Sequence, residues 1–282
     1  MRTIKEKAYA KVNLYLDVLG KLENGYHNLE MVIAPLALHD TLTFKKRKDD
    51  LIELTTSKTI TGNIKDNLVY RIAKYLQEQY LIKEGVSIEL EKNIPIGAGL
   101  GGGSADAAAT LRGLNKLWKL NLSLDELAQL GKSFGADIPY CIYNKICIAR
   151  GVGDELVFLN NKLNYKILLI YPNIHMSTKE VYANVKIEEL PTKKMTRMTE
   201  AVYNRNFDLL TQELYNALEI SAFDLVPKLK DLKTQIEKWK VEGVLMSGSG
   251  STIYILTKDY HKLTDIEKVY RDKYQTIITK IK

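Results

Sequence analysis

A glycine-rich segment that runs directly into alanines restricts the folds open to this chain more than any other stretch. Residues 94–109 read Ile-Pro-Ile-Gly-Ala-Gly-Leu-Gly-Gly-Gly-Ser-Ala-Asp-Ala-Ala-Ala. Glycine permits positive φ angles and a close approach to a ligand, whereas alanine has the highest helix propensity. We therefore expect a loop over the glycines and a helix that begins where they end. The N–H groups at such a helix N-terminus favour a bound phosphate.

The sequence patterns of three well-known nucleotide-binding loops do not match this segment fully. A Walker A loop needs a lysine before its Ser or Thr, and none separates Gly103 from Ser104. The Rossmann pattern G-x-G-x-x-G is present, but it follows a break at residues 93–95, and Asn121 stands where an acidic residue is needed. A protein-kinase loop is followed by a strand, which the alanines disfavour. The pattern P-x-x-x-G-L-G-G-G-S before a helix remains, with a turn that binds no ligand as the alternative.

The composition indicates a metabolic enzyme of one large or two ordinary domains. The chain has 282 residues, 45% of them hydrophobic, and no apolar run approaches the ~20 residues of a membrane span. Residues 1–6 are charged and lack the apolar core of a secretory signal, so we expect a cytoplasmic protein with no membrane partner. Cys141 and Cys147 are too few for a disulfide scaffold, and we expect buried free thiols.

The net charge of +7 suits anionic ligands but does not predict a nucleic-acid partner. Lysines and acids alternate along most of the chain. The one dense basic patch, residues 45–48, is followed at once by Asp49 and Asp50. We therefore expect a charged hairpin tip there and no nucleic-acid interface.

Hydrophobic periodicity predicts mixed strands and helices in the first part of the chain. Apolar residues alternate over residues 10–18, and Asn24-Gly25 is typical of a hairpin turn. Ser123 and Glu126 form a capping box. The predicted strands cover residues 10–18, 26–33, 40–46, 86–90, 140–143 and 147–150, and the predicted helices cover residues 67–79, 104–118 and 124–134.

A polar stretch over residues 160–164 predicts a boundary between domains 1–160 and 161–282. Beyond it the expected order is β-α-β-β-α-β, as in a ferredoxin-like fold. The predicted strands cover residues 165–171, 244–246, 252–256 and 274–281, and the predicted helices cover residues 177–185, 198–218, 227–239 and 259–270.

Five motifs in order closely resemble those of the GHMP small-molecule kinases. They are Ala10–Leu14, Asn24–Leu29, Pro95–Ala108, Gly135–Pro139 and Ser247–Ser251. The resemblance implies an α+β fold with an N-terminal domain like ribosomal protein S5, a ferredoxin-like C-terminal domain and an active site in the cleft between them. It also implies ATP-dependent phosphorylation of a small alcohol. Gly-Tyr-His and Gly-Ala-Asp-Ile-Pro imply a substrate that carries a cytidine diphosphate group.

The resemblance assigns the catalytic roles to Lys11 and Asp137. Asp137, in a non-helical loop before a proline, would take or orient the proton of the acceptor hydroxyl. Lysine is depleted in strands, and Lys11 would keep Asp137 ionised and stabilise the moving phosphoryl group. Asn13, on the same strand face, would hydrogen-bond the substrate, with a satisfied polar side chain as the alternative.

The same resemblance assigns ATP binding to the glycine loop. The residues are Pro95, Ile96, Gly97, Ala98, Gly99, Leu100, Gly101, Gly102, Gly103, Ser104 and Ala105. The Ser104 hydroxyl would reach a phosphate or Mg²⁺. Asp106 would either reach Mg²⁺ or only complement the helix dipole. Ala105 stands where the family often has a second serine, so one phosphate contact is expected to be absent.

For the substrate, Tyr26 and His27 resemble the family's base-recognition pair, and Tyr182 would supply an opposite aromatic wall. Gly248 and Gly250 would form a turn over the substrate phosphates, with a plain hairpin as the alternative. Two other functions remain open. One is a GHMP kinase with a different acceptor, such as mevalonate, homoserine or a sugar. The other is a non-catalytic nucleotide sensor or RNA-associated protein. We expect a monomer or weak homodimer.

Overall fold

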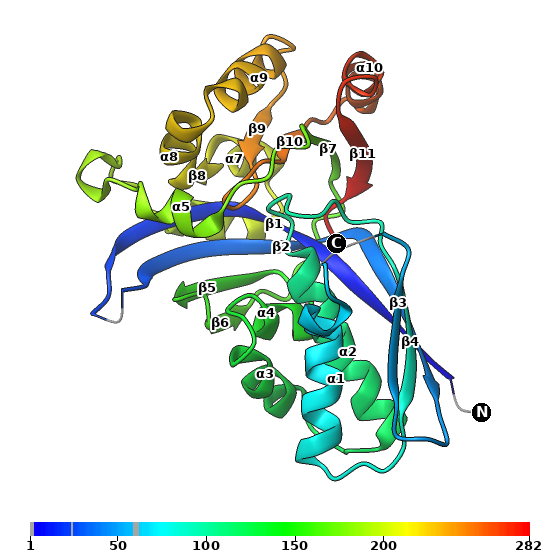
Figure 1. Ribbon diagram of the computed structural model, residues 1–282. Helices are drawn as coiled ribbons and strands as arrows, with labels where there is room; N and C mark the ends of the chain where they lie inside the picture. Colours follow the sequence, from blue (N-terminus) through cyan, green and yellow to red (C-terminus); the bar gives the residue numbers. More distant parts are fainter. Residues whose placement is uncertain (1–2, 24, 59–61) are drawn as a thin grey trace. The chain divides into compact units, whose positions relative to one another are not determined.

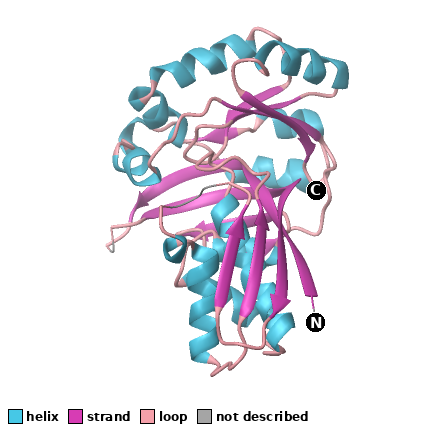
Figure 2. Cartoon of the chain, turned by 45° about the vertical axis from the view of Figure 1, so that its right-hand side comes forward, coloured by secondary structure: helices cyan, strands magenta, loops and turns pink. Residues whose placement is uncertain are grey.

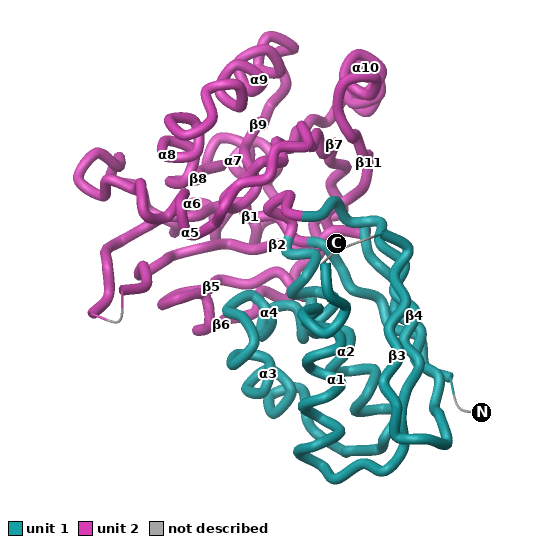
Figure 3. Tube along the Cα trace, viewed as in Figure 1, with its two compact units in different colours: residues 1–10, 38–96, 101–144 teal, residues 11–37, 97–100, 145–282 magenta. Residues whose placement is uncertain are grey.

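The computed structural model describes residues 3–23, 25–58 and 62–282, which form two compact units of mixed helix and sheet (Figure 3). Unit 1 comprises residues 1–10, 38–96 and 101–144, and unit 2 comprises residues 11–37, 97–100 and 145–282. The domain boundary predicted after residue 160 stays a prediction. No helix within the described ranges is both long enough and apolar enough to span a membrane.

Two long strands, β1 (Thr3–Lys21) and β2 (His27–Lys46), contribute to both units (Figure 1). A turn joins them in which the Leu22 N–H donates to the Tyr26 carbonyl at 2.7 Å. Asn24 of the predicted turn lies outside the described residues. Separate strands over residues 26–33 and 40–46 were the wrong prediction, because β2 continues through Leu36, which is fully buried and pairs with Ile281.

In unit 1, β4 (Val86–Glu91) pairs antiparallel with the last part of β2 and parallel with β3 (Ile52–Thr56). A close approach links this sheet to α2 (Gly102–Trp118), because a side chain at Gly113 would collide with the Phe44 ring of β2. The other helical segments of unit 1 are η1 (Ile64–Asp66), α1 (Leu68–Gln79), α3 (Leu124–Lys132) and α4 (Ile138–Tyr143).

Side-chain caps fix the starts of α1 and α3. The Asn67 side chain accepts from the Val69 N–H, and the Ser123–Glu126 capping box predicted from the sequence is confirmed. The strand predicted at residues 140–143 is wrong, since these residues belong to α4. Pro139 lies in the first turn of α4, where its missing N–H costs no helical hydrogen bond.

Unit 2 contains a four-stranded antiparallel sheet in its described residues, in the order β11-β7-β10-β9. The helices α9 (Pro227–Glu237) and α10 (Tyr260–Tyr270) cover one face (Figures 1 and 2) and share a core with β7 and β10 that includes Leu168, Leu232, Ile255 and Leu263. The strands are β7 (Lys166–Tyr171), β9 (Gly243–Met246), β10 (Ile253–Leu256) and β11 (Gln275–Lys280). The strand order and connections confirm the ferredoxin-like prediction.

The helix predicted over residues 198–218 is broken into several elements. Arg205 adopts a φ of 52°, and the Asn206 side chain caps the next helix by accepting from the Leu209 N–H. A short strand follows, β8 (Tyr215–Asn216), which pairs parallel with β1. The remaining elements of unit 2 are β5 (Cys147–Gly151), β6 (Glu155–Phe158), α5 (Thr178–Ala183), η2 (Ile187–Glu189), α6 (Met195–Tyr203), α7 (Phe207–Gln212) and α8 (Leu218–Leu225).

Candidate active site

Parts of the glycine loop have a backbone conformation that a residue with a side chain could not easily adopt. Gly99 has a φ of 74°, and a Cβ there would collide with the Ser247 carbonyl. Gly101 has a φ of 68° and is the N-cap of α2, which begins at Gly102, two residues earlier than predicted. At Gly103, in the first turn, a Cβ would meet no protein atom within 4 Å. The start of this helix is therefore open enough for an anion to approach its N–H groups.

Lys11 and Asn13 lie on β1 beside the first half of this loop. The Lys11 N–H donates to the Leu100 carbonyl at 3.0 Å. Lys11 is only 6% exposed, and its ammonium donates to Asn13 Oδ1 at 2.8 Å. Asn13 Nδ2 donates to Met31 Sδ at 3.3 Å. Burying a charged lysine costs free energy unless the ammonium has polar partners. Asn13 supplies one such partner to Lys11.

The turn between β9 and β10 packs against the same residues. The Ser247 hydroxyl donates to the Gly99 carbonyl at 2.9 Å, and the Thr252 N–H donates to the Ala98 carbonyl. A Cβ added at Gly248 would lie 3.6 Å from Lys11 Nζ and 3.7 Å from Asn13 Oδ1. Unit 2 therefore brings together one half of the glycine loop, the strand lysine and the predicted third motif.

Asp137 lies in unit 1, at the N-cap of α4. Its φ and ψ of −80° and −12° are helical, which corrects the expectation of a non-helical loop position. Its side chain does not cap the helix, and its carbonyl accepts from the Cys141 N–H at 3.1 Å. The residue is half-buried. The helix start thus fixes the backbone of Asp137 without occupying its carboxylate as a cap.

The His27 and Tyr182 rings lie against each other, with centroids 5.2 Å apart and planes tilted by 32°. A base stacked between two rings needs them about 7 Å apart, so no base fits between these two. Tyr26 is 63% exposed. Burial, with a smaller contribution from Lys21, lowers the pKa of His27. The neutral imidazole offers one donor and one acceptor.

Comparison with known proteins agrees with this arrangement. A model of the GHMP kinases N terminal domain matches residues 67–145, and a model of the GHMP kinases C terminal domain matches residues 198–276. The 4-diphosphocytidyl-2-C-methyl-D-erythritol kinase of Bacillus cytotoxicus is 39% identical over 264 residues, which is 94% of this chain and 90% of that protein. The chain belongs to the GHMP kinase family. It is an ATP-dependent small-molecule kinase.

Other relatives extend the match to structure. The 4-diphosphocytidyl-2-C-methyl-D-erythritol kinase of Geobacillus sp. (strain WCH70) is 40% identical and covers 92% of this chain and 90% of that protein. A crystal structure of 4-(cytidine 5'-diphospho)-2C-methyl-D-erythritol kinase has a TM-score of 0.85 and 32% identity, with 99% of each chain covered. A crystal structure of L. major mevalonate kinase shares the fold, with a TM-score of 0.75 at 15% identity and with 100% of this chain and 96% of that chain covered.

Behind the loop, the kinase contains a buried ionic cluster that the sequence did not predict. Lys92 Nζ donates to Asp106 Oδ2 at 2.7 Å and also bonds Asp40. The second oxygen of Asp40 accepts from the N–H groups of Asn93 and Ile94, the residues just before the loop. Asp40 and Lys92 therefore anchor the entry to the glycine loop. The available signal was a charged residue in an apolar strand, Asp40, with a lysine three residues before Pro95.

Burial raises the pKa of Asp106 to about 8, although the neighbouring Lys92 opposes the shift. Asp106 is 4% exposed, and its Oδ1 is buried with no hydrogen-bond partner among the described residues. Ser104, two residues earlier, is half-buried. Of the two residues predicted to contact Mg²⁺, Ser104 keeps that role as a prediction, whereas the enclosed carboxyl group of Asp106 belongs to the ionic cluster.

Proposed function

We propose that this kinase transfers the γ-phosphoryl group of ATP to the 2-hydroxyl of 4-diphosphocytidyl-2-C-methyl-D-erythritol, in non-mevalonate isoprenoid precursor biosynthesis. Relatives of that name, at 39% and 40% identity over more than nine tenths of the chain, support this acceptor. The observation that carries the proposal is the convergence of Lys11, Asn13 and Gly248 beside the glycine loop. The enzyme would act in the cytoplasm as a monomer or weak homodimer.

In the proposed reaction the acceptor oxygen forms a bond to the γ-phosphorus, and the bond from that phosphorus to the bridging oxygen of ADP breaks. The hydroxyl proton goes to Asp137, or is oriented by it. The Lys11 ammonium stabilises charge on the transferring group, and the N–H groups at the start of α2 bind phosphate oxygens. Asn13 hydrogen-bonds the acceptor. The protein thus supplies position and charge rather than a covalent intermediate.

For the cytosine end we propose that Tyr26 offers its exposed ring as a stacking surface and His27 reads the base edge. The lowered pKa of His27 favours the neutral ring, whose donor and acceptor nitrogens suit a cytosine edge. Tyr182 would support His27 from behind, because the two rings already touch. Gly248 and Gly250 would lie over the substrate phosphates.

Mg²⁺ would enter with ATP and neutralise part of its phosphate charge. The Ser104 hydroxyl, in the first turn of α2, would be the protein group nearest the ion. We assign no metal contact to Asp106, because one carboxylate oxygen is bonded to Lys92 and the other is sealed from solvent. The alternative role predicted for Asp106, complementing the helix dipole from the first turn, is also wrong, because α2 begins at Gly102 and its first turn contains no acidic residue.

An acceptor panel tests the proposed substrate. Purified protein with ATP and Mg²⁺ is given the cytidine diphosphate acceptor, mevalonate, homoserine or a sugar, and ADP release is measured. We expect turnover with the cytidine substrate alone. Turnover with mevalonate or homoserine but not with the cytidine substrate would assign another acceptor. Absence of turnover with every acceptor, together with steeply salt-dependent RNA binding, would instead support a non-catalytic protein.

A further inference from the structure

Asn216, on the short strand β8, uses its whole side chain to hold the turn between β9 and β10. Its Nδ2 donates to the Met246 carbonyl and to the Gly248 carbonyl, each at 2.8 Å, and its Oδ1 accepts from the Leu218 N–H at 3.0 Å. The residue is 3% exposed. An amide that satisfies both donors and its acceptor in this way fixes the backbone it contacts.

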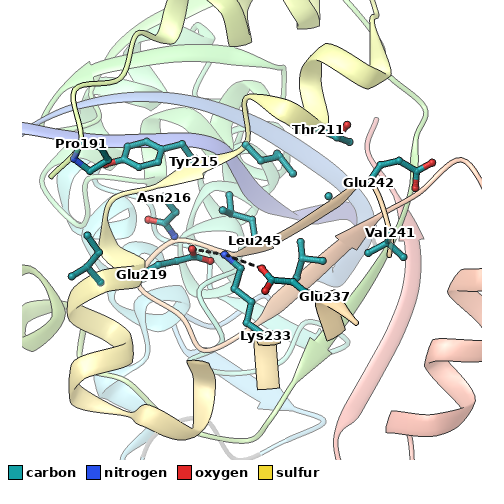
Figure 4. A pocket seen from close by; sticks show the side chains of 14 residues that line it. Pro191, Thr211, Tyr215, Asn216, Glu219, Lys233, Glu237, Val241, Glu242 and Leu245 are labelled. Atoms are coloured by element: carbon teal, nitrogen blue, oxygen red, sulfur yellow. Dashed lines mark hydrogen bonds and ion pairs between the residues drawn. The ribbon is translucent and has the colours of Figure 1, made fainter. Parts of the chain in front are cut away.

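Glu219, three residues later, also hydrogen-bonds Met246, the last residue of β9. Its Oε1 accepts from the Met246 N–H at 2.8 Å, and its Oε2 accepts from Lys233 Nζ on α9 at 2.6 Å. Figure 4 shows Lys233 between Glu219 and Glu237, at one wall of a pocket of about 360 Å³. Asn216 and Glu219 together therefore engage both outward backbone groups of Met246.

Covering the outer edge of β9 is one reason for these contacts, because edge strands leave N–H and C=O groups unpaired. The bond to the Gly248 carbonyl goes further, since Gly248 lies beyond the strand and within the turn. The space beside the Gly248 Cα is next to Lys11 Nζ and Asn13 Oδ1, which lie 3.6 Å and 3.7 Å from where a Cβ would stand. The Asn216 amide thus acts on the same peptide segment that packs against the proposed catalytic lysine.

The register of β8 ties Asn216 to the strand that carries that lysine. Leu16 of β1 pairs with Asn216, and the Ala217 N–H donates to the Leu16 carbonyl at 2.9 Å. One backbone segment is therefore bonded to β1, while its side chain is bonded to the turn. This connection sets the spacing between Gly248 and the Lys11–Asn13 pair.

We propose that Asn216 is a positioning residue of the kinase, supported by Glu219, which holds Gly248 at a fixed spacing from Lys11 and Asn13. The inference rests on the proposed function, because it takes Gly248 to lie over the substrate phosphates. Displacing a reacting group by 1 Å costs about a hundredfold in rate. Loss of the Asn216 amide therefore affects turnover more than ATP binding, which the glycine loop provides.

The test compares Asn216→Ala with Ser221→Ala. Ser221 is also buried, and its hydroxyl donates to the Leu218 carbonyl on α8 rather than to the turn. We expect Asn216→Ala to lower kcat about tenfold to a hundredfold while the KM for ATP changes by less than about threefold. Hydrogen exchange at the Ser247, Gly250 and Thr252 amides is expected to accelerate at least about tenfold. Ser221→Ala is expected to change neither.

Glu219 provides an independent pair of variants. Glu219→Gln keeps an acceptor for the Met246 N–H and is expected to retain kcat within about threefold, whereas Glu219→Ala is expected to lower it about tenfold. Glu219→Ala removes a second side-chain hydrogen bond to the Met246 backbone, so this pair of variants tests the proposal even if Asn216→Ala does not fold. Wild-type kcat and wild-type amide exchange in Asn216→Ala and Glu219→Ala would overturn the proposal. An inactive wild-type enzyme would contradict the proposed acceptor alone, since amide exchange needs no substrate.

Discussion

Asp137 carries the proposed proton transfer, and replacing it with asparagine isolates that role. The amide keeps the size and the helix start but cannot accept the hydroxyl proton. We expect Asp137→Asn to lower kcat by about 10² to 10⁴, with ATP affinity within about threefold of wild type. Steady-state kinetics with titration of a fluorescent ATP analogue measures both.

The matched control for this variant is Asp208→Asn. Asp208 is a solvent-exposed carboxylate paired with Lys258 and has no part in the proposed site. Its replacement is expected to leave kcat unchanged. Turnover by Asp137→Asn at the rate of Asp208→Asn would remove Asp137 from the mechanism.

Asp106 predicts a pH dependence of stability. Its pKa is about 8 in the folded protein, well above the ordinary value for an aspartate, so between about pH 4 and pH 8 the folded state binds more protons than the unfolded state. Its contribution to the free energy of unfolding therefore falls as pH rises to about 8 and is constant above it. We expect the stability difference between wild type and Asp106→Asn to follow this course in urea unfolding. A difference that does not vary between pH 5 and pH 9 would contradict it.

The residues of the site differ in how far sequence could predict them. Lys11 and Asn13 were accessible because a polar pair in an alternating strand is unusual and the family motif covers it. Lys92 and Asp40 were not, because their ion pair joins positions 52 residues apart and only the folded sheet brings them together. The resemblance placed Tyr182 opposite the Tyr26–His27 pair, but the sequence could not show that the Tyr182 and His27 rings touch each other.

At the scale of elements, the open start of α2 leads to a prediction for the variant Gly103→Ala. Gly103→Ala introduces a methyl group where no protein atom lies within 4 Å, and alanine favours helix. We expect the variant to be as stable as wild type or up to about 1 kcal/mol more stable, yet to raise the KM for ATP at least about tenfold. The reason is that the methyl group would occupy the space left for a phosphate.

Gly20→Ala is the control for that variant. A Cβ at Gly20 also meets no atom within 4 Å, but this residue lies on β1, outside the loop. Thermal unfolding and ATP kinetics on both variants separate a local steric effect from a general one. An unchanged KM for ATP in Gly103→Ala would show that the phosphate lies elsewhere.

The elements that sequence predicted well are those with local signals, such as the capping box at Ser123 and the hairpin strands around residues 247–251. The predictions of secondary structure that were wrong concern segments without a clear local signal. Around Pro139 we expected a non-helical loop and then a strand, but proline is accepted in the first turn of a helix, and α4 begins there. The helix predicted over residues 198–218 is interrupted at Arg205, whose left-handed φ of 52° no local sequence signal indicated.

At the scale of the whole molecule, the densest basic patch, residues 45–48, lies beside acidic residues. Within the described residues, Lys45 pairs with Glu89, Lys46 with Glu84, and Arg47 with Asp49 and Glu53. These pairs offset the charge of three of the four basic residues. The predicted hairpin tip is wrong, because β2 and the strand that follows it, β3, each pair with β4 and not with each other. The family resemblance predicted the fold of both halves because its motifs are spread along nearly the whole chain, whereas periodicity alone gave only the ferredoxin-like order.

The central claim is that this kinase transfers phosphate from ATP to an alcohol bearing a cytidine diphosphate group. Single-turnover reaction with [γ-³²P]ATP and the cytidine acceptor, followed by anion-exchange chromatography, tests it most directly. We predict that the label moves to a product that elutes with the ultraviolet absorbance of cytidine, at a rate that Asp137→Asn reduces by about 10² or more. Label that stays in ATP, or appears only as inorganic phosphate, would contradict the account.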